Sequence, residues 1–347
     1  MKKIYALTDY KGHFGSKWKA KPYRSGLDKE SLIKYFANNN WEIQFIQFKD
    51  IDFKDNWKDK LIIYTSSEEF GLYYKSYIED VVLGLVQAGA KVIPGYAFLR
   101  ANNNKVFMEI LREHLLKNIP TGIFSRVYGT INELEDDLSK NRLNFPCVIK
   151  KAEGAMSRGV FLAQEKSSLL KYAKAISNKH NIKGQIKETI RTYKHKNYKI
   201  ESPYQGKFIV QNFVPNLTND WKVLIYGNHY YVLNRGIRKN DFRASGSHFN
   251  YKAGSQARIT ETMLFKIKEI YNAFNIPHLS LDFAWDGKNA IIHEFQAVYF
   301  GTSTMDFSKD LFVFENEKWN ILPAKQTQEE EYAYSLINYL EKTEGKN

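Results

Sequence analysis

The sequence predicts an α/β protein with an N-terminal domain of parallel βαβ units and two further sections of paired strands and helices. Short apolar strands and amphipathic helices alternate over the first section, which indicates parallel βαβ units. After Pro120 the pattern changes to strands that return through glycine-bearing turns. We therefore expect three sections, with limits 1–100, 101–206 and 207–347.

The first section alternates strands and helices in order. Asp28 is the expected N-cap of its first helix, and Gly89 ends its second. A basic, glycine-containing loop, 9–26, follows the first strand. The predicted strands are 2–8, 41–48, 60–67 and 90–95, and the predicted helices are 28–40 and 73–89.

The later sections contain longer helices and hairpin-like strand pairs. Pro120 ends the first helix, and Thr260 is the expected cap of another. A Gly227–Asn228 turn pairs two strands, and a basic polar stretch before Gly206 carries no predicted element. The predicted helices are 102–120, 167–179, 260–274 and 329–342, and the predicted strands are 145–151, 160–164, 207–215, 221–237 and 279–296.

The net charge of the chain does not by itself identify its class of function. The 347 residues include 51 lysines and arginines against 38 aspartates and glutamates, a formal net charge of +13. Such a balance favours anionic partners: nucleic acid, acidic membrane or polyanionic small substrates. A generally basic surface explains the same charge. The basic residues are densest at 11–24 and 187–199.

Composition indicates a folded, reduced, cytoplasmic protein. The chain is 43% apolar, and its single cysteine, Cys147, excludes an intramolecular disulfide and any CxxC motif. We expect Cys147 to be a core residue. The first apolar run is too short for a signal peptide, and no run approaches the ~18 apolar residues of a membrane span. We expect no membrane partner, and a homodimer is left open.

Residues 279–296 read LSLDFAWDGKNAIIHEFQ, two apolar strands with one carboxylate on each, Asp282 and Glu294. If Asp286 and Ala290 close a three-residue loop, Asp282 lies directly opposite Glu294; a two-residue loop places the acids on opposite faces. Two opposed carboxylates need a cation, or one must stay protonated. Hard oxygen ligands with an amide nearby suit Mg²⁺ or Mn²⁺ bridging a polyphosphate. The alternative is two acids that each pair with a lysine.

Three further patterns have the composition of nucleotide sites. In FPCVIKKAEGAMSRGVFLA a lysine ends an apolar strand and a small-residue loop follows, in which backbone N–H groups can approach phosphates. Gln211 and Asn212 lie in a strand that turns at Pro215 and exposes the backbone edge that adenine recognition needs. Arginines 235, 238 and 243 suit carboxylate or phosphate. An ordinary hairpin and a solvated loop are the alternatives for the first and last patterns.

In this order, these motifs resemble the ATP-grasp superfamily, and more closely its ribosomal-protein glutamate ligase and glutathione synthetase-like carboxylate–amine ligases. The resemblance covers residues 101–305 and rests on PCVIKKAEGAMSRGV, DWKVLIYGNHYYVLNR, NDFRAS and the D-x11-E-x-Q spacing. It implies two α+β subdomains that bind ATP between them, a lid-bearing one and a metal-binding one. A Rossmann-like α/β domain that helps to bind substrate would precede them.

The resemblance implies four sets of site residues. Phosphates would be contacted by Lys105 and Lys150. The mobile phosphate lid would comprise Gly154, Ala155, Met156, Ser157, Arg158 and Gly159. The adenine hinge would comprise Gln211, Asn212, Phe213 and Val214. Transferred phosphate and substrate carboxylate would be neutralised by the catalytic set Lys222, Arg235 and Arg243, and two Mg²⁺ or Mn²⁺ ions would be held by Asp282, Glu294 and Gln296.

The sequence departs from the family pattern in three places. The third metal position is usually asparagine, whereas here it is Gln296. The lid GAMSRG is poorer in glycine than many, because Met156 and Arg158 occupy it. The stretch AVYFGTSTMDFS, which should shape the acceptor pocket, does not match the usual small-residue ending.

The implied activity is an ATP-dependent carboxylate–amine ligase that forms an amide through an acyl phosphate and releases ADP and phosphate. Its partners would be a small-molecule or polymer-borne carboxylate and an amine acceptor. Phosphoryl transfer needs mainly positioning and charge neutralisation, which a site of lysines, arginines and metal carboxylates supplies. The alternatives are a kinase on the same scaffold and a catalytically inactive, basic nucleic-acid-binding protein. No RNP motif, helix-turn-helix signal or zinc-ligand pattern supports nucleic-acid binding.

Overall fold

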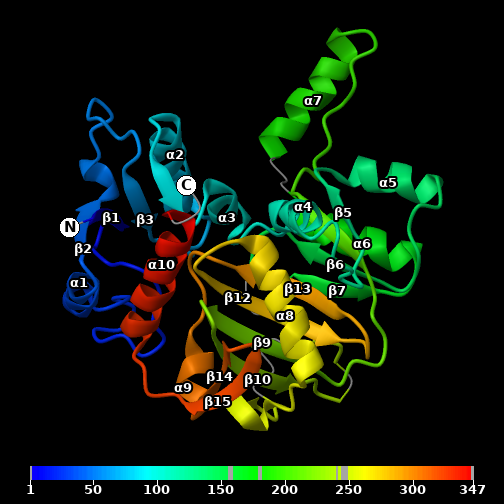
Figure 1. Ribbon diagram of the computed structural model, residues 1–347. Coiled ribbons are helices and arrows are strands. Elements are labelled where there is room, and N and C mark those ends of the chain that lie inside the picture. The colour runs from blue at the N-terminus through cyan, green and yellow to red at the C-terminus, as the bar shows by residue number, and fades with distance from the viewer. Residues whose placement is uncertain (1, 155–158, 179–181, 240, 244–248, 345–347) are drawn as a thin grey trace. The chain divides into compact units, whose positions relative to one another are not determined.

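The chain has a mixed α/β fold in two compact units. A computed structural model describes residues 2–154, 159–178, 182–239, 241–243 and 249–344 (Figure 1). The first unit comprises Met1–Asn102, His114–Gly122 and Leu217–Asn347, and the second comprises Asn103–Glu113 and Ile123–Asn216. The described strands form three sheets. The finer expectation, a Rossmann-like domain and two α+β subdomains with limits at 100 and 206, remains a proposal.

The first unit begins with a parallel sheet in the order β2-β1-β3-β4. The strands are β1 Lys2–Thr8, β2 Trp41–Gln47, β3 Leu61–Tyr64 and β4 Lys91–Ile93. The short 3₁₀ helix η1 is Phe48–Asp50, and the α-helices are α1 Lys29–Asn38, α2 Tyr73–Gln87 and α3 Tyr96–Ala101. Asp28 caps α1 by accepting a 2.7 Å hydrogen bond from Ser31 N. The strand–helix alternation predicted for this section is therefore present.

The C-terminal helix α10, Gln328–Glu344, supplies apolar side chains to the core of this parallel sheet. Its Leu336 and Leu340 are buried with Ile4 of β1 and Phe36 of α1 in one cluster. Residues from opposite ends of the chain therefore share this core.

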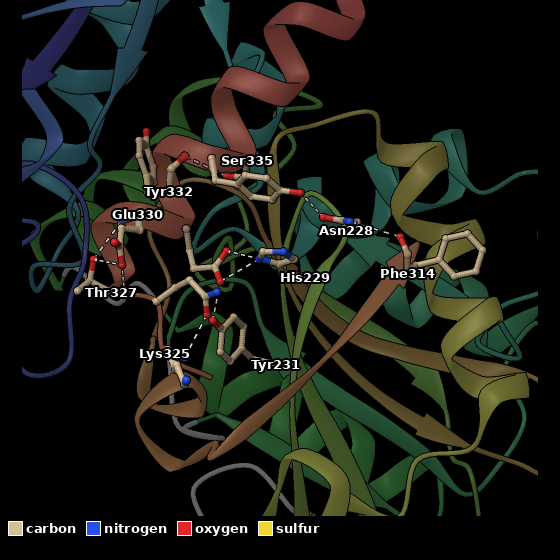
Figure 2. A network of polar contacts seen from close by, with 12 residues as sticks. Asn228, His229, Tyr231, Phe314, Lys325, Thr327, Glu330, Tyr332 and Ser335 are labelled. Atoms are coloured by element: carbon tan, nitrogen blue, oxygen red, sulfur yellow. Dashed lines mark hydrogen bonds and ion pairs between the residues drawn. The ribbon is translucent and has the colours of Figure 1, made fainter. Parts of the chain in front are cut away.

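The first turn of α10 is also held by polar contacts (Figure 2). Glu331 accepts a 2.6 Å hydrogen bond from Tyr231 Oη and lies 2.8 Å from His229 Nδ1. Glu329 forms an ion pair with Lys17, whose Nζ is 2.8 Å away, so the helix also binds the basic loop 9–26. These contacts connect the N-terminal loop, α10 and the larger sheet within the first unit.

The larger sheet of the first unit has the order β13-β12-β9-β10-β14-β15, with β11 paired to β10. Its strands are antiparallel: β9 Asn219–Tyr226, β10 His229–Gly236, β11 Lys252–Ala253, β12 His278–Trp285, β13 Ala290–Gln296, β14 Asp310–Glu315 and β15 Lys318–Pro323. The helices are η2 Gly254–Ala257, α8 Glu261–Phe274 and α9 Ser303–Phe307. The predicted turn at Gly227–Asn228 is confirmed, since Tyr226 pairs with His229.

The second unit contains an antiparallel sheet in the order β5-β8-β6-β7. Its strands are β5 Ser125–Tyr128, β6 Cys147–Lys151, β7 Val160–Ala163 and β8 Phe208–Asn212. The helix α4, Lys105–Leu115, begins in this unit, which also holds α5 Ile131–Ser139, α6 Lys166–Ser177 and α7 Ile182–Lys194. Cys147 is buried and unpaired.

Several elements were not predicted from the sequence. The basic polar stretch before Gly206, for which no element was predicted, contains α7, whose apolar residues have helical spacing but stand among many polar and charged ones. The pairs β5 with β8 and β14 with β15 were also missed. Among the described helices, none is long and apolar enough to cross a bilayer.

Candidate active site

Five predicted site residues lie on four adjacent strands of the larger sheet. Lys222 on β9 pairs with Asp282 on β12, and Asp282 pairs with Glu294 on β13. Directly opposed residues share one face, so these three side chains form a row. Gln296, two residues beyond Glu294, shares that face because side chains alternate along a strand. Arg235 reaches the row from the neighbouring β10.

Arg235 is a buried cation held between two carboxylates. Its Nε and Nη2 donate to the two oxygens of Asp220 over 2.7 and 2.8 Å, and Nη2 also donates to Asp282 Oδ2 over 2.9 Å. Burial opposes its charge, but Asp282 and Asp220 outweigh burial and raise the pKa of Arg235 above its usual range. The planar guanidinium is therefore fixed in orientation by a bidentate pair.

Asp282 is neutralised by protein cations. Besides Arg235, Lys222 donates to its Oδ1 over 3.3 Å and to Ser280 Oγ over 2.7 Å. Burial alone would raise the pKa of Asp282, but Arg235 and Lys222 outweigh it and lower the pKa to about 2. Arg235 and Lys222 thus supply part of the positive charge that two opposed acids require. The alternative considered from the sequence, in which each acid pairs with a lysine, holds for Asp282.

Asp220 is a site residue that sequence reasoning missed. It is buried and bonded to Arg235 through both oxygens. Burial raises its pKa to about 6, against the opposing charge of Arg235. The signal was present in the sequence: Asp220 lies two residues before Lys222, and this spacing puts both on one strand face.

The register that opposes Asp282 to Glu294 is confirmed, but neither the three-residue nor the two-residue loop considered from the sequence is present. Trp285, not Asp286, pairs with Ala290, so the loop has four residues between the paired ones. Asp286 Oδ1 accepts hydrogen bonds from two backbone N–H groups inside the loop, which stabilises this longer turn.

A β-bulge restores the register. With the four-residue loop alone, Asp282 would oppose His293 and Glu294 would move to the other face. The pairing shifts between Asp282 and Phe283, so that His293 becomes the extra residue of β13. The acids therefore meet because of a local irregularity that strand alternation does not reveal.

The row contains three side chains whose oxygens could bind a hard divalent cation. No described hydrogen bond or ion pair engages the Glu294 carboxylate, which stands opposite Asp282. Glu294, Asp282 and the amide oxygen of Gln296 are oxygen donors of the type that Mg²⁺ prefers. Within the described ranges, no group of three or more histidine, cysteine, aspartate or glutamate residues is arranged to hold a metal. The candidate set instead has two carboxylates and one amide.

Arg243 is placed by a local contact. Its Nε donates to Asp241 Oδ1 over 2.9 Å, and its side chain is 39% exposed. The structure therefore pairs Arg243 with a residue two positions away, whereas Arg235 and Lys222 are joined through Asp282. In the described part of the site, no contact of the Arg243 side chain supports its proposed role.

The second unit brings Lys105 to the glycine-bearing loop after β6. Lys105 Nζ donates to Gly154 O over 2.8 Å, and its backbone N donates to Ala152 O over 2.8 Å. Gly159, at the other end of the loop, accepts from Lys151 N over 2.9 Å, and Lys150 precedes it on β6. The predicted lid residues Ala155, Met156, Ser157 and Arg158 lie outside the described residues.

The predicted hinge lies at the end of β8. Gln211 is buried, and its Nε2 donates to Ser125 Oγ over 2.9 Å. Asn212 accepts from Phe124 N over 2.7 Å through its side chain. Phe213 and Val214 follow the strand and are half-buried. The side chains of Gln211 and Asn212 therefore also secure the chain near β5, a role that the sequence pattern did not indicate.

A buried polar group beside Gln211 was also missed. Glu109 Oε2 accepts from Arg112 and Ser125, and all three side chains are buried in the second unit. In the described structure, Glu109 Oε1 and Gln211 Oε1 are buried acceptors without a hydrogen-bond partner. An unpaired buried acceptor costs about 1–3 kcal/mol, so a hydrogen-bond donor placed beside either oxygen would stabilise the structure.

His278, the first residue of β12, predicts a pH dependence of stability. Burial lowers its pKa to about 4, against a hydrogen bond with the Ala297 backbone. Since the folded pKa lies below the unfolded value, stability is complete above pH ~6.5 and is lost as pH falls toward 4, by about 3 kcal/mol. Urea unfolding across this range should show the loss in the wild type and not in His278→Phe. Equal pH dependence in both proteins would contradict the prediction.

Comparison with known proteins supports a fold assignment. No protein-family model matches this sequence, and no curated protein matches it by sequence. VanG D-Ala:D-Ser ligase from Enterococcus faecalis matches in structure with a TM-score of 0.55 and 13% identity, over 97% of this chain and 99% of that chain. D-cycloserine synthetase DcsG matches with a TM-score of 0.54 and 11% identity, over 97% and 99%. N5-carboxyaminoimidazole ribonucleotide synthetase from Thermus thermophilus matches with a TM-score of 0.53 and 13% identity, over 96% and 78%.

The chain has the ATP-grasp fold.

The ATP-grasp resemblance inferred for residues 101–305 is therefore confirmed at the level of the fold, and the structural similarity extends over nearly the whole chain. These proteins have 11% and 13% identity to this chain, so their similarity establishes no activity. The closer likeness to ribosomal-protein glutamate ligases remains a prediction.

Proposed function

We propose that this chain is an ATP-dependent carboxylate–amine ligase that forms an amide and releases ADP and phosphate. The observation that carries the proposal is the row on the larger sheet of the ATP-grasp fold. There two cations, Arg235 and Lys222, converge on Asp282, and the Glu294 carboxylate stands beside them. Fixed cations beside oxygen donors are what phosphoryl transfer requires of a protein.

Arg235 and Lys222 would neutralise the charge that develops on the transferred phosphoryl group. Both are held in place before any substrate binds, Arg235 by Asp220 and Lys222 by Ser280. Charges that need no reorganisation during reaction stabilise a transition state more than mobile ones. Arg243 would bind the substrate carboxylate after release from Asp241.

Asp282, Glu294 and Gln296 would hold Mg²⁺ or Mn²⁺, with two ions as the proposed number. A bound divalent ion would neutralise phosphate charge at this position. Gln296 is one methylene longer than asparagine, so its amide oxygen reaches further from β13. The three residues belong to two adjacent strands, which fixes the spacing of their backbones.

The second unit would bind the nucleotide. Lys105 and Lys150 would contact phosphates, with the loop from Gly154 to Gly159 closing over them. Lys105 already bonds the loop backbone at Gly154. Residues Gln211, Asn212, Phe213 and Val214 would hold adenine, and the unpaired Gln211 Oε1 would accept a hydrogen bond from its amino group.

The proposed reaction has two steps. A substrate carboxylate oxygen attacks the γ-phosphorus of ATP, the bond from that phosphorus to the β,γ-bridging oxygen breaks, and ADP leaves. The amine nitrogen then attacks the acyl carbon, the carbon–oxygen bond to phosphate breaks, and the amine proton is released. No covalent enzyme nucleophile is needed. Cys147 fits this role poorly, because burial raises its pKa to about 11.

Trapping with hydroxylamine tests the ligase against the kinase alternative. The chain is incubated with Mg·ATP, a panel of mono- and dicarboxylic acids and hydroxylamine. An acyl phosphate intermediate is expected to yield a hydroxamate in amounts equal to the ADP released, and Glu294→Gln should yield neither. ADP formation without hydroxamate, together with a phosphorylated hydroxyl compound, would instead establish a kinase.

A further inference from the structure

Between α6 and β8, the chain of the second unit makes an excursion that carries α7 away from the β-sheet of that unit (Figure 1). Gly206 N donates to Ser177 O over 2.9 Å, which joins the two ends of the excursion. A Cβ at Gly206 would lie 2.8 Å from Ser177 Cα, so only glycine fits this crossing. The excursion contains α7 and is thus a defined projection of the fold.

One face of α7 carries exposed apolar side chains. Ile186, Ile190 and Tyr193 are 57%, 45% and 88% exposed. Their spacing of four and three residues places them in one stripe along the helix. A helix that only meets water normally carries polar residues at such positions.

The opposite face of α7 is covered by the returning chain. Glu188 lies on this face and accepts hydrogen bonds from Arg191 Nη1 over 2.5 Å, Tyr198 Oη over 2.6 Å and Glu201 N over 3.2 Å. The return segment is therefore tied to the helix on the side away from Ile186 and leaves the apolar stripe open.

The stripe is flanked by cations. Residues 183–199 contain six lysines and arginines and one acid, Glu188. Lys187 and Lys194 lie beside the stripe on one side and are exposed, and Lys196 and Lys199 follow the helix and are also exposed. An aliphatic stripe with one aromatic ring, bordered by a cluster of lysines, has the chemistry of a helix that lies in an anionic lipid interface.

We propose that α7 and its return segment form a peripheral binding surface for an anionic lipid bilayer. Nucleic acid would use the lysines and leave Ile186 and Ile190 without a role. A second copy of the chain is disfavoured as the partner, because two molecules of net charge +13 would repel each other where their basic helices meet. A bilayer with acidic headgroups uses both features, since the stripe enters the acyl boundary while the lysines meet the headgroups. This proposal is independent of the ligase activity.

Vesicle sedimentation tests the proposal. The full chain is mixed with phosphatidylcholine vesicles containing about 30% phosphatidylserine, or with pure phosphatidylcholine vesicles. Binding is expected only to the anionic vesicles and should weaken as salt is added. Ile186→Ser with Ile190→Ser should weaken binding at least about tenfold, and Lys187→Gln with Lys194→Gln about 25-fold, because each cation contributes about fivefold.

Matched substitutions elsewhere serve as controls. Ile33→Ser removes another isoleucine that is 45% exposed, and Lys171→Gln with Lys174→Gln removes two exposed lysines of α6; both should bind vesicles as the wild type does. A wild type that stays in the supernatant overturns the proposal, as does unchanged binding by the double isoleucine variant. Equal binding to neutral vesicles overturns it too. Capture of duplex DNA with the same affinity by wild type and isoleucine variant would assign the cations to nucleic acid.

Discussion

Replacing Arg235 with methionine is expected to lower the free energy of unfolding by about 3–5 kcal/mol, because it leaves buried carboxylates without their cation. Arg235 bonds both oxygens of Asp220 and also Asp282. Methionine has a similar length and no charge, so packing is largely kept and the electrostatic loss dominates. Urea unfolding near neutral pH measures the change. ATP turnover by the folded fraction should be lost as well.

A double variant separates charge imbalance from misfolding. In Asp220→Asn with Arg235→Met, one buried carboxylate is removed along with the cation, so we expect part of the lost stability to return. Arg142→Met is the matched control: its guanidinium pairs with Asp137 over 3.1 Å, and its side chain is 49% exposed. Exposed pairs contribute about 0–1 kcal/mol. An Arg235→Met effect no larger than that of Arg142→Met would show that the buried pairing contributes little.

Glu294→Gln is expected to abolish most of the stabilisation of the chain by Mg·ATP. At a nucleotide concentration ~100 times Kd, a bound ligand stabilises the folded state by about 2.7 kcal/mol. Glutamine keeps the size of the side chain and removes the charge that would attract a divalent cation. A 100-fold weaker affinity would reduce the stabilisation to about 0.4 kcal/mol. Thermal unfolding with and without Mg·ATP measures the difference.

The ligand-free stability of Glu294→Gln should be close to that of the wild type. No described contact engages the Glu294 carboxylate, so its loss breaks no ion pair. Glu315→Gln, an exposed acid at the end of β14, is the matched control and should respond to Mg·ATP as the wild type does. Full Mg·ATP stabilisation of Glu294→Gln would remove Glu294 from the metal site.

The candidate site was partly predictable from the sequence. Asp282 and Glu294 stood out in the sequence because each is a single carboxylate within an apolar strand. Their predicted pairing across the two strands is confirmed. The reason for that pairing was not predictable, since a longer loop and a bulge at His293 compensate each other. Turn length and bulges depend on hydrogen bonds that single-residue patterns do not encode.

The spacing to Lys222 puts Asp220 on the site face of its strand, but its pairing with Arg235 could not be predicted from the sequence. An isolated aspartate at the start of a strand resembles a solvent-exposed residue until the strand order is known. Its partner Arg235 lies on β10, and Asp282 lies on β12, while β9 runs between them in the sheet. Only this order brings one cation within reach of both acids.

By itself, the sequence determined the α/β class, the alternating first section, the caps of several helices and the residue types of the candidate site. These features depend on local preferences and on periodicity, which a single chain displays directly. Tertiary structure decided that Lys222 and Arg235 neutralise Asp282 while Glu294 keeps a carboxylate without a described partner. Those contacts join residues up to 60 positions apart. They depend on strand order and register, which the burial of the whole sheet selects.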